Sequence, residues 1–107
     1  MGVSKTQLFT TPQNDMATIC KALAHPARIA IIEYLLSVNS CICGDIVNVV
    51  PLAQPTVSQH LKELRNANII MGTIEGTAIC YCLNQKVIAK FKNYFALFSS
   101  QLDLKCC

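Results

Sequence analysis

Cysteine is the residue type with the most chemistry to offer in this sequence, because seven cysteines occur in 107 residues. Six of them form three close pairs and one is isolated: Cys41 and Cys43, Cys80 and Cys82, Cys106 and Cys107, and Cys20. Thiolates bind soft metal ions and metalloids, and neighbouring thiols can oxidise to disulfides. An odd number of cysteines argues against a fully paired disulfide scaffold. We therefore expect a cytoplasmic protein whose reduced thiols serve as ligands or sensors.

The length and composition fit one folded domain with a partner. Apolar residues make up 52% of the chain and charged residues 14%, which excludes disorder and predicts that part of the apolar surface lies in a subunit interface. The net charge of +3 permits nucleic-acid binding without requiring it. The first six residues carry no apolar stretch, and no apolar run approaches the roughly 18 residues of a membrane span. We therefore expect no signal peptide and no membrane partner.

The spacing of apolar residues predicts the elements that must position these thiols. Helices are expected over 15–24, 26–38, 41–50 and 55–67, followed by a β-hairpin with strands 72–74 and 77–83 and a last helix over 85–102. Four residues, 51–54, supply a tight turn between two short helices. This order predicts a mainly α winged helix-turn-helix with a small β-hairpin. Residues 1–14 are then an N-terminal arm, 15–102 the domain, and 103–107 a cysteine-containing tail.

The expected core follows from the same spacing. Inward stripes are predicted at Met16, Ile19, Cys20 and Leu23; at Ile29, Ile32 and Leu36; and at Val87, Ile88, Phe91, Tyr94, Phe95, Phe98 and Leu102. Cys80 and Cys82 alternate with Ile79, Tyr81 and Leu83 along one strand, so the two cysteines share a face about 7 Å apart. Packing is the expected role of Cys20, Cys80 and Cys82, although Cys20 also remains a candidate ligand.

The helix over 55–67 has two chemically different faces. At 100° per residue, Val57, Leu61 and Leu64 fall on one side and face the core. The opposite side carries small hydrogen-bonding side chains and one cation: Pro55, Ser58, Gln59 and Lys62, with Thr56 at the flank. Such a face suits a helix whose N-terminal end enters the major groove, where Gln can read adenine. The pattern therefore predicts binding to double-stranded DNA.

Three stretches of the sequence form a set: LAHPARI at 23–29, QPTVSQHLKEL at 54–64, and IEG at 74–76 ahead of Tyr81. Together they resemble the ArsR/SmtB family of metalloregulatory repressors over roughly residues 16–98. The resemblance implies a homodimeric winged-helix repressor, not an enzyme, that leaves operator DNA when an inducer binds and needs no cofactor to bind DNA. It implies a DNA-binding set of Gln54, Pro55, Thr56, Ser58, Gln59, His60 and Lys62. It also implies that the first and last helices form the dimer, which fits the stripe of Phe91, Phe95 and Phe98.

The hairpin departs from the family pattern, because it carries no arginine and has Glu75 at its tip. Phosphate contacts must then come from other cations, for which the candidates are Lys5, Lys21, Arg28, Lys62 and Arg65. With so few cations, the salt dependence of DNA binding should be shallow.

The pair Cys41 and Cys43 occupies the place where arsenic, cadmium and lead sensors of the family carry Cys-x-Cys before an Asp, although here the acid is one residue further on. Residues two apart on a regular helix point about 200° apart, so the pair can share an ion only at an irregular helix start, with Ser40 as its cap. As(III) prefers three thiolates, and Cys106, Cys107 or Cys20 could supply the third. The predicted metal site is Cys41, Cys43, Cys106 and Cys107, with As(III) or another thiophilic ion as inducer.

The cysteines and the predicted fold also allow other hypotheses about function. A redox- or persulfide-responsive repressor, in which thiols pair on oxidation, is one, and a cadmium- or lead-responsive repressor is another. A winged helix that binds protein in place of DNA would fit the uncharged hairpin. A thiol oxidoreductase is disfavoured, because the sequence has no Cys-x-x-Cys and no βαβ pattern. The last helix lacks the Asp-x-His and His-x-x-Glu pairs of the family's interfacial zinc site, so we expect no such site.

Overall fold

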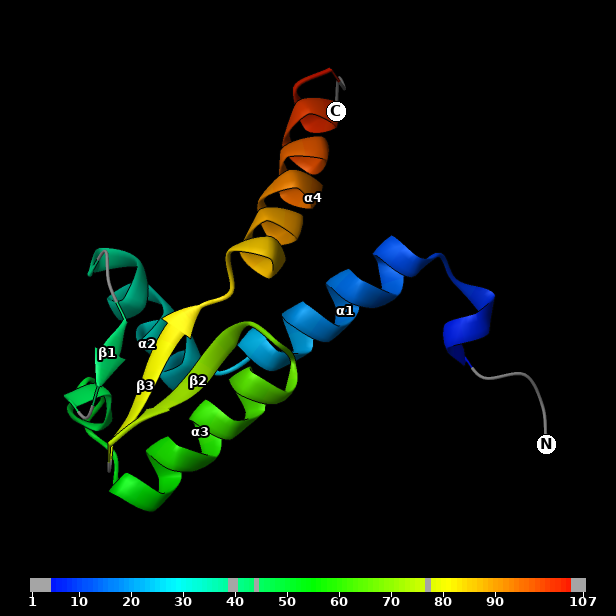
Figure 1. The fold of residues 1–107 in the computed structure, drawn as a ribbon. Coiled ribbons are helices and arrows are strands. Elements are labelled where there is room, and N and C mark those ends of the chain that lie inside the picture. Colours follow the sequence, from blue (N-terminus) through cyan, green and yellow to red (C-terminus); the bar gives the residue numbers. More distant parts are fainter. Residues whose placement is uncertain (1–4, 39–40, 44, 77, 105–107) are drawn as a thin grey trace.

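The computed structural model describes residues 5–38, 41–43, 45–76 and 78–104. Its elements are η1 (Lys5–Leu8), α1 (Thr11–Leu23), α2 (Pro26–Ser37), β1 (Ile42–Cys43), η2 (Asp45–Asn48), α3 (Gln54–Asn66), β2 (Ile70–Glu75), β3 (Ala78–Leu83) and α4 (Gln85–Leu104). Helices α2 and α3 pack with the sheet into one body, from which α1 and α4 extend (Figure 1). The prediction of a mainly α winged helix-turn-helix is confirmed.

Helix α1 begins earlier than the sequence predicted. Thr10 is its N-cap, and it forms a reciprocal capping box with Gln13, in which the Gln13 amide N–H donates to Thr10 Oγ1 over 3.2 Å and the Thr10 N–H donates to Gln13 Oε1 over 3.0 Å. Pro12 lies in the segment expected to be an N-terminal arm, but the first turn of a helix does not need the missing N–H of proline. The start expected at Asp15 is therefore wrong, and residues 11–14 belong to the helix.

The buried face of α2 differs from the predicted one. Ala27, Ile31, Ile32 and Leu35 are buried, whereas Ile29 and Leu36 are 43% and 57% exposed. Of the predicted stripe only Ile32 is correct. The helix is apolar on nearly every side, so periodicity alone could not select the face that meets α3 and the sheet.

The segment after α2 is a strand and a short 3-10 turn where the sequence predicted a helix over 41–50. β1 pairs antiparallel with β3, with Ile42 opposite Tyr81 and Cys43 opposite Cys80, and the strand order is β1-β3-β2. A short apolar run has no clear helical or strand period, so the neighbouring strand decides its conformation. Ile46 and Val50 then bury their side chains in the core and anchor η2 ahead of α3.

Helix α3 ends in a Schellman motif. The N–H of Asn68 donates to the Arg65 carbonyl over 2.9 Å, and the N–H of Ile69 donates to the Leu64 carbonyl over 3.0 Å. Asn68 has a φ of 60°, the left-handed conformation that asparagine can adopt at the end of a helix. Leu64 and Ile69 are fully buried, which supplies the apolar contact of the motif.

Helix α4 is partly buried over its first half, and the inward stripe predicted for its second half is wrong. Val87, Ile88 and Phe91 pack against the core, whereas Phe95 and Phe98 are 40% and 51% exposed. Within the described ranges, no helix is long and apolar enough to cross a membrane.

The left-handed backbone of Asn68 makes a clear stability prediction. Asn68→Gly should leave the free energy of unfolding within about 0.5 kcal/mol of the original, because glycine adopts positive φ without steric cost. Asn68→Ala should lower it by about 1 kcal/mol, because alanine keeps the Cβ that crowds the carbonyl but lacks the short polar side chain that lets asparagine adopt this conformation. Urea denaturation of the three proteins measures both differences, and equal stability of the alanine and glycine variants would contradict the motif.

Candidate nucleic-acid interface and thiol pair

Helix α3 has one polar, exposed face and one apolar face that packs against the core. Val57, Leu61 and Leu64 are at most 2% exposed, which confirms the predicted inner face. The opposite face is exposed along the first two turns, at Gln54, Pro55, Thr56, Ser58, Gln59 and Lys62. The helix lies along one edge of the body, and none of the labelled helices and strands covers its outer side (Figure 1). Its side chains are therefore free to contact a partner.

The amide of Gln59 is held in position by its own helix. Gln59 Nε2 donates to Glu63 Oε1 over 3.2 Å, one helical turn away. The contact is exposed, so a base edge in the major groove can replace it at small cost. The partner therefore meets a Gln side chain that already points outward.

His60 belongs to the core and not to the exposed face. The side chain is 8% exposed, and its Nδ1 accepts from Arg28 Nε over 3.1 Å. Its ring lies 4.2 Å from the ring of His25, which caps α2 by accepting the Ala27 N–H. The family resemblance implied that His60 contacts DNA. The structure corrects this expectation, because the ring is buried and joins α3 to the start of α2.

The same hydrogen bonds hold the side chain of Arg28, which was a candidate for phosphate contact, inside the protein. Its guanidinium donates to His60 and, through a second nitrogen, to the Ala22 carbonyl over 3.1 Å. Arg28 therefore links three helices and does not extend to a phosphate. Of the other predicted phosphate contacts, Lys21, Lys62 and Arg65 are exposed, and the side chain of Lys5 lies outside the described residues.

Cys41 and Cys82 form a disulfide that joins the start of β1 to β3, with their Cα atoms 4.5 Å apart. Cys80 is also disulfide-bonded and is only 1% exposed. The expectation of reduced thiols is wrong for these residues, and Cys82 does more than pack. The physical reason is the strand pairing, which places each cysteine of β3 opposite the 41–43 segment.

Of the four cysteines in the predicted metal site, the structure describes the side chain of Cys41 alone. Cys106, Cys107, Ser40 and the side chain of Cys43 lie outside what the structure describes. Among the described residues, no three His, Cys, Asp or Glu side chains are close enough to hold a metal ion. Cys20 is a free, exposed thiol on α1, so its predicted place in the core is wrong.

The sequence held a signal for the Cys41–Cys82 pair. Two Cys-x-Cys segments on facing antiparallel strands put their cysteines at opposite register positions on one face. The signal was missed because residues 41–50 were assigned to a helix, where the same spacing separates the thiols.

The chain is similar to known transcriptional regulators. The family described as "Bacterial regulatory protein, arsR family" matches residues 25–71, which run from the cap of α2 into β2. The transcriptional repressor SdpR of Bacillus subtilis is 31% identical over 88 residues, covering 82% of this chain and 97% of SdpR. The chain belongs to the ArsR family. The match thus includes the α2–β1–α3 segment that carries both the polar face and Cys41.

Other ArsR relatives differ in length. The repressor SmtB of Mycobacterium tuberculosis is 38% identical over 65 residues, and the match covers 61% of this chain but only 47% of SmtB, about half its length. Repressors named for arsenical and for cadmium resistance in Staphylococcus species are 30% and 34% identical. Among solved structures, an ArsR-like regulator from Rhodococcus sp. RHA1 has the same fold, with a TM-score of 0.70, 16% identity and coverage of 88% of each chain.

The buried His60 should make this ArsR-family fold sensitive to mild acid. Burial foremost, and then the nearby His25 and Arg28, lower the pKa of His60 below its usual 6.5. The unfolded chain therefore takes up the proton first as pH falls, so stability is complete above about pH 6.5 and decreases below it. His60→Gln keeps an acceptor for Arg28 and should flatten the stability profile between about pH 7 and 5.5. Chemical denaturation at each pH measures this, and an unchanged slope in the variant would refute the assignment.

Proposed function

We propose that this protein is a homodimeric, cytoplasmic repressor that binds double-stranded operator DNA through α3 and leaves it when an inducer engages its thiols. The observation that carries the proposal is the exposed, polar N-terminal half of α3 over a fully buried apolar face. The proposal requires no cofactor for this DNA contact and assigns the protein no enzymatic activity.

DNA contact is assigned to the exposed members of the predicted set. Gln59 reads a base, Thr56 and Ser58 bond bases or phosphates, and Lys62 neutralises a phosphate. Gln54 and Pro55 open the helix and bring its N-terminal end toward the backbone. His60 supports this surface from behind through Arg28.

The dimer is assigned to the outer half of α4, where aromatic rings form a continuous exposed stripe. Ring centroids lie 5.1 Å apart for Tyr94 and Phe98 and 5.6 Å apart for Phe95 and Phe98. Leu97 and Leu102 are 57% and 68% exposed beside them. Apolar area of this size on a helix that leaves the body is typical of a subunit interface.

The inducer site is assigned to Cys41 and Cys43, with Cys106 and Cys107 as further ligands of As(III) or another thiophilic ion. Cys41 lies directly before β1, which contacts η2, and η2 contacts α3. A bond formed at Cys41 can therefore shift the turn that sets the angle of α3. In a dimer, a small tilt spoils the one-turn spacing of the two half-sites.

A redox-responsive repressor is the second candidate, and the Cys41–Cys82 disulfide favours it. Oxidation would fix β1 to β3 and restrict the same turn. The ion and the oxidant act at one element, so a parallel titration is needed to separate them.

Alanine substitutions on α3 should affect DNA binding in two different ways. Gln59→Ala should cost about 1–3 kcal/mol of specific binding and relax the preference at one base position. Lys62→Ala should weaken binding to all sequences and reduce the magnitude of the log–log salt slope by nearly 2 for the dimer. Fluorescence anisotropy at several salt concentrations measures both.

Lys92→Ala is the matched control for this test, because it removes an exposed cation from α4 and should change neither quantity. A wild-type salt slope steeper than about −8 would contradict the few-cation interface. If the protein forms no specific complex with the DNA upstream of its own gene, the result would favour a module that binds protein in place of DNA.

Charge placed on the α4 stripe should dissociate the dimer. Phe98→Glu puts a carboxylate into the apolar interface, and sedimentation should show a shift to monomer at micromolar concentration. Ile74 is 80% exposed on β2, so Ile74→Glu is the control and should leave the dimer intact. A dimeric Phe98→Glu protein would refute the interface.

The inducer is identified by titrating the DNA complex with arsenite, cadmium and peroxide in parallel. The active agent should release the wild-type protein, and the double variant Cys41→Ser/Cys43→Ser should stay bound at the same concentrations. Cys20→Ser is the control and should respond like wild type. Release of the double variant at wild-type concentrations would contradict a role of these thiols.

A further inference from the structure

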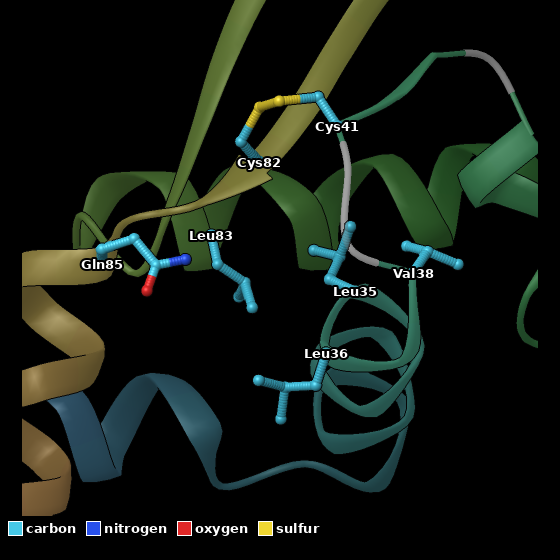
Figure 2. Close-up of a pocket in the computed structure, with 7 residues that line it drawn as sticks. All are labelled: Leu35, Leu36, Val38, Cys41, Cys82, Leu83 and Gln85. Atoms are coloured by element: carbon cyan, nitrogen blue, oxygen red, sulfur yellow. A yellow bond between two sulfur atoms is a disulfide. The ribbon is translucent and has the colours of Figure 1, made fainter.

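The two edges of the three-stranded sheet are protected to different extents. At one edge β1 has only two residues, and its start is tied to β3 by the Cys41–Cys82 disulfide, beside the end of α2 (Figure 2). At the other edge β2 has six residues, Ile70–Glu75, and pairs with β3 on one side only. A strand in this position can offer its outer row of backbone N–H and C=O groups to another strand.

The register of the hairpin shows which residues of β2 direct their backbone outward. The Asn84 N–H donates to the Ile69 carbonyl over 2.9 Å, and the pairing continues without a break to the end of β2. Hydrogen-bonded and non-hydrogen-bonded pairs alternate along an antiparallel ladder, so the groups of Ile70, Gly72 and Ile74 point away from β3. Ile70 is only 1% exposed, whereas Gly72 and Ile74 are exposed. Within the described ranges, neither of these two makes a backbone hydrogen bond to another element, so both can meet a partner.

The side chains of β2 do not protect this edge. Edge strands often carry Lys, Pro or a bulge that prevents pairing with another chain, and β2 has none of these. Glu75 is the only charged residue between Arg65 and Lys86 in the sequence. Ile74 and Met71 are 80% and 47% exposed. The strand therefore combines exposed apolar side chains with outward backbone groups, and this combination favours pairing.

We propose that β2 pairs antiparallel with β2 of a second copy of this chain, across a twofold axis at Thr73, so that dimers associate through their hairpins. In this register Gly72 lies opposite the partner's Ile74, and each such pair exchanges two hydrogen bonds. The register uses the two exposed outward residues, whereas an axis at Gly72 would require the buried Ile70. A twofold contact needs only one kind of surface, because each copy supplies the same strand.

The strand is complementary to itself in this register. Ile74 lies opposite a glycine, which leaves room for its side chain, and Thr73 lies opposite the partner's Thr73, a favourable cross-strand pair. Met71 lies opposite the partner's Glu75, so the register places no two like charges opposite each other. An unrelated strand would have to match all of these positions. A second copy of the chain is therefore the occupant that the sequence of β2 fits best.

This contact joins dimers to one another and is separate from the stripe on α4. In Figure 1 the turn-side ends of β2 and β3 and the outer half of α4 point away from each other. Two residues per strand make a small and weak contact, below the size of a stable interface. Tethering strengthens it, because two dimers held side by side have an effective concentration in about the millimolar range. Dimers on neighbouring stretches of DNA would therefore bind cooperatively, although the pairing itself needs no DNA.

Disulfide trapping at position 73 tests the register on the full chain without DNA. Opposite residues of a non-hydrogen-bonded pair have Cα atoms about 4.5 Å apart, which suits a disulfide. The background carries serine in place of Cys20, Cys106 and Cys107. Mild oxidation of Thr73→Cys should then link two chains through residue 73, which peptide mapping identifies. Met71→Cys is the matched control on the same strand and face, and it should give about tenfold less linked product, because the two copies of residue 71 are separated by about four residues along the paired strands.

A charge at the edge of β2 tests whether this strand carries the association of dimers. Sedimentation equilibrium up to about the millimolar range should show wild-type dimers forming tetramers. Ile74→Glu should stay dimeric and raise the Kd of the tetramer step by about tenfold or more, because a charged edge strand resists pairing. Leu36 is 57% exposed on α2, so Leu36→Glu is the control and should leave this Kd within about threefold of wild type.

Three results would each overturn the proposal. They are no excess of linked Thr73→Cys chains over linked Met71→Cys chains, a wild-type protein that does not associate beyond its α4 dimer, and a tetramer Kd of Ile74→Glu within about threefold of wild type. None of these measurements uses DNA. Failure of the hairpin contact is therefore distinct from failure of the proposed repressor function, which the operator titrations decide.

Discussion

The antiparallel pairing of β1 with β3 is the constraint on which the rest of the molecule's proposed behaviour depends. It places Cys41 opposite Cys82, and it reduces the first helix of the helix-turn-helix to the short turn η2. The turn η2 contacts both β1 and α3. A movement of Cys41 on forming or breaking a bond is therefore transmitted through η2 to the helix that carries the DNA-facing side chains. The thiol of Cys41 and the DNA-facing helix are thus joined through one short element, η2.

Helix α3 is held so firmly that such a change would move it as a unit. Its inner face is closed by Val57, Leu61 and Leu64, and its C-terminal end by the Schellman motif at Asn68. From the other side, Arg28 ties His60 to the carbonyl of Ala22, which fixes α3 to α1 and α2. A rigid helix on an adjustable turn can occupy two positions relative to the dimer axis, and linkage between inducer and DNA requires two such states.

Much of this could be predicted from the sequence where one physical signal dominated. The two faces of α3, the hairpin and the left-handed Asn68 follow from strong helical period, alternation and turn chemistry. The buried face of α2 could not be predicted, because apolar side chains occur on nearly every side of this helix. The secondary structure of residues 41–50 could not be predicted either, because this apolar run is too short to show a helical or strand period. In both places tertiary contacts decide, and only the fold reveals which neighbour is available.

The site was predictable to the same extent. Exposure of Gln59 and Lys62 followed from the helical wheel, which also places His60 near Leu64 at the inner side of α3. The partner of His60 could not be predicted in this way, because Arg28 lies 32 residues away in sequence. The pairing of Cys41 with Cys82 spans 41 residues and depends on strand register. Local sequence patterns do not predict contacts between residues so far apart in the chain. The pairing of the thiols therefore becomes clear only once the strand order of the sheet is known.

The coupling between the thiols and α3 is tested most directly by the operator affinity of one protein sample, measured first with the Cys41–Cys82 pair reduced and then with it oxidised. The oxidised form should bind about tenfold or more weakly, a change within the usual range of allosteric coupling, and Cys41→Ser/Cys82→Ser should show no difference between the two treatments. Equal operator affinity of the reduced and oxidised wild-type protein would contradict the coupling.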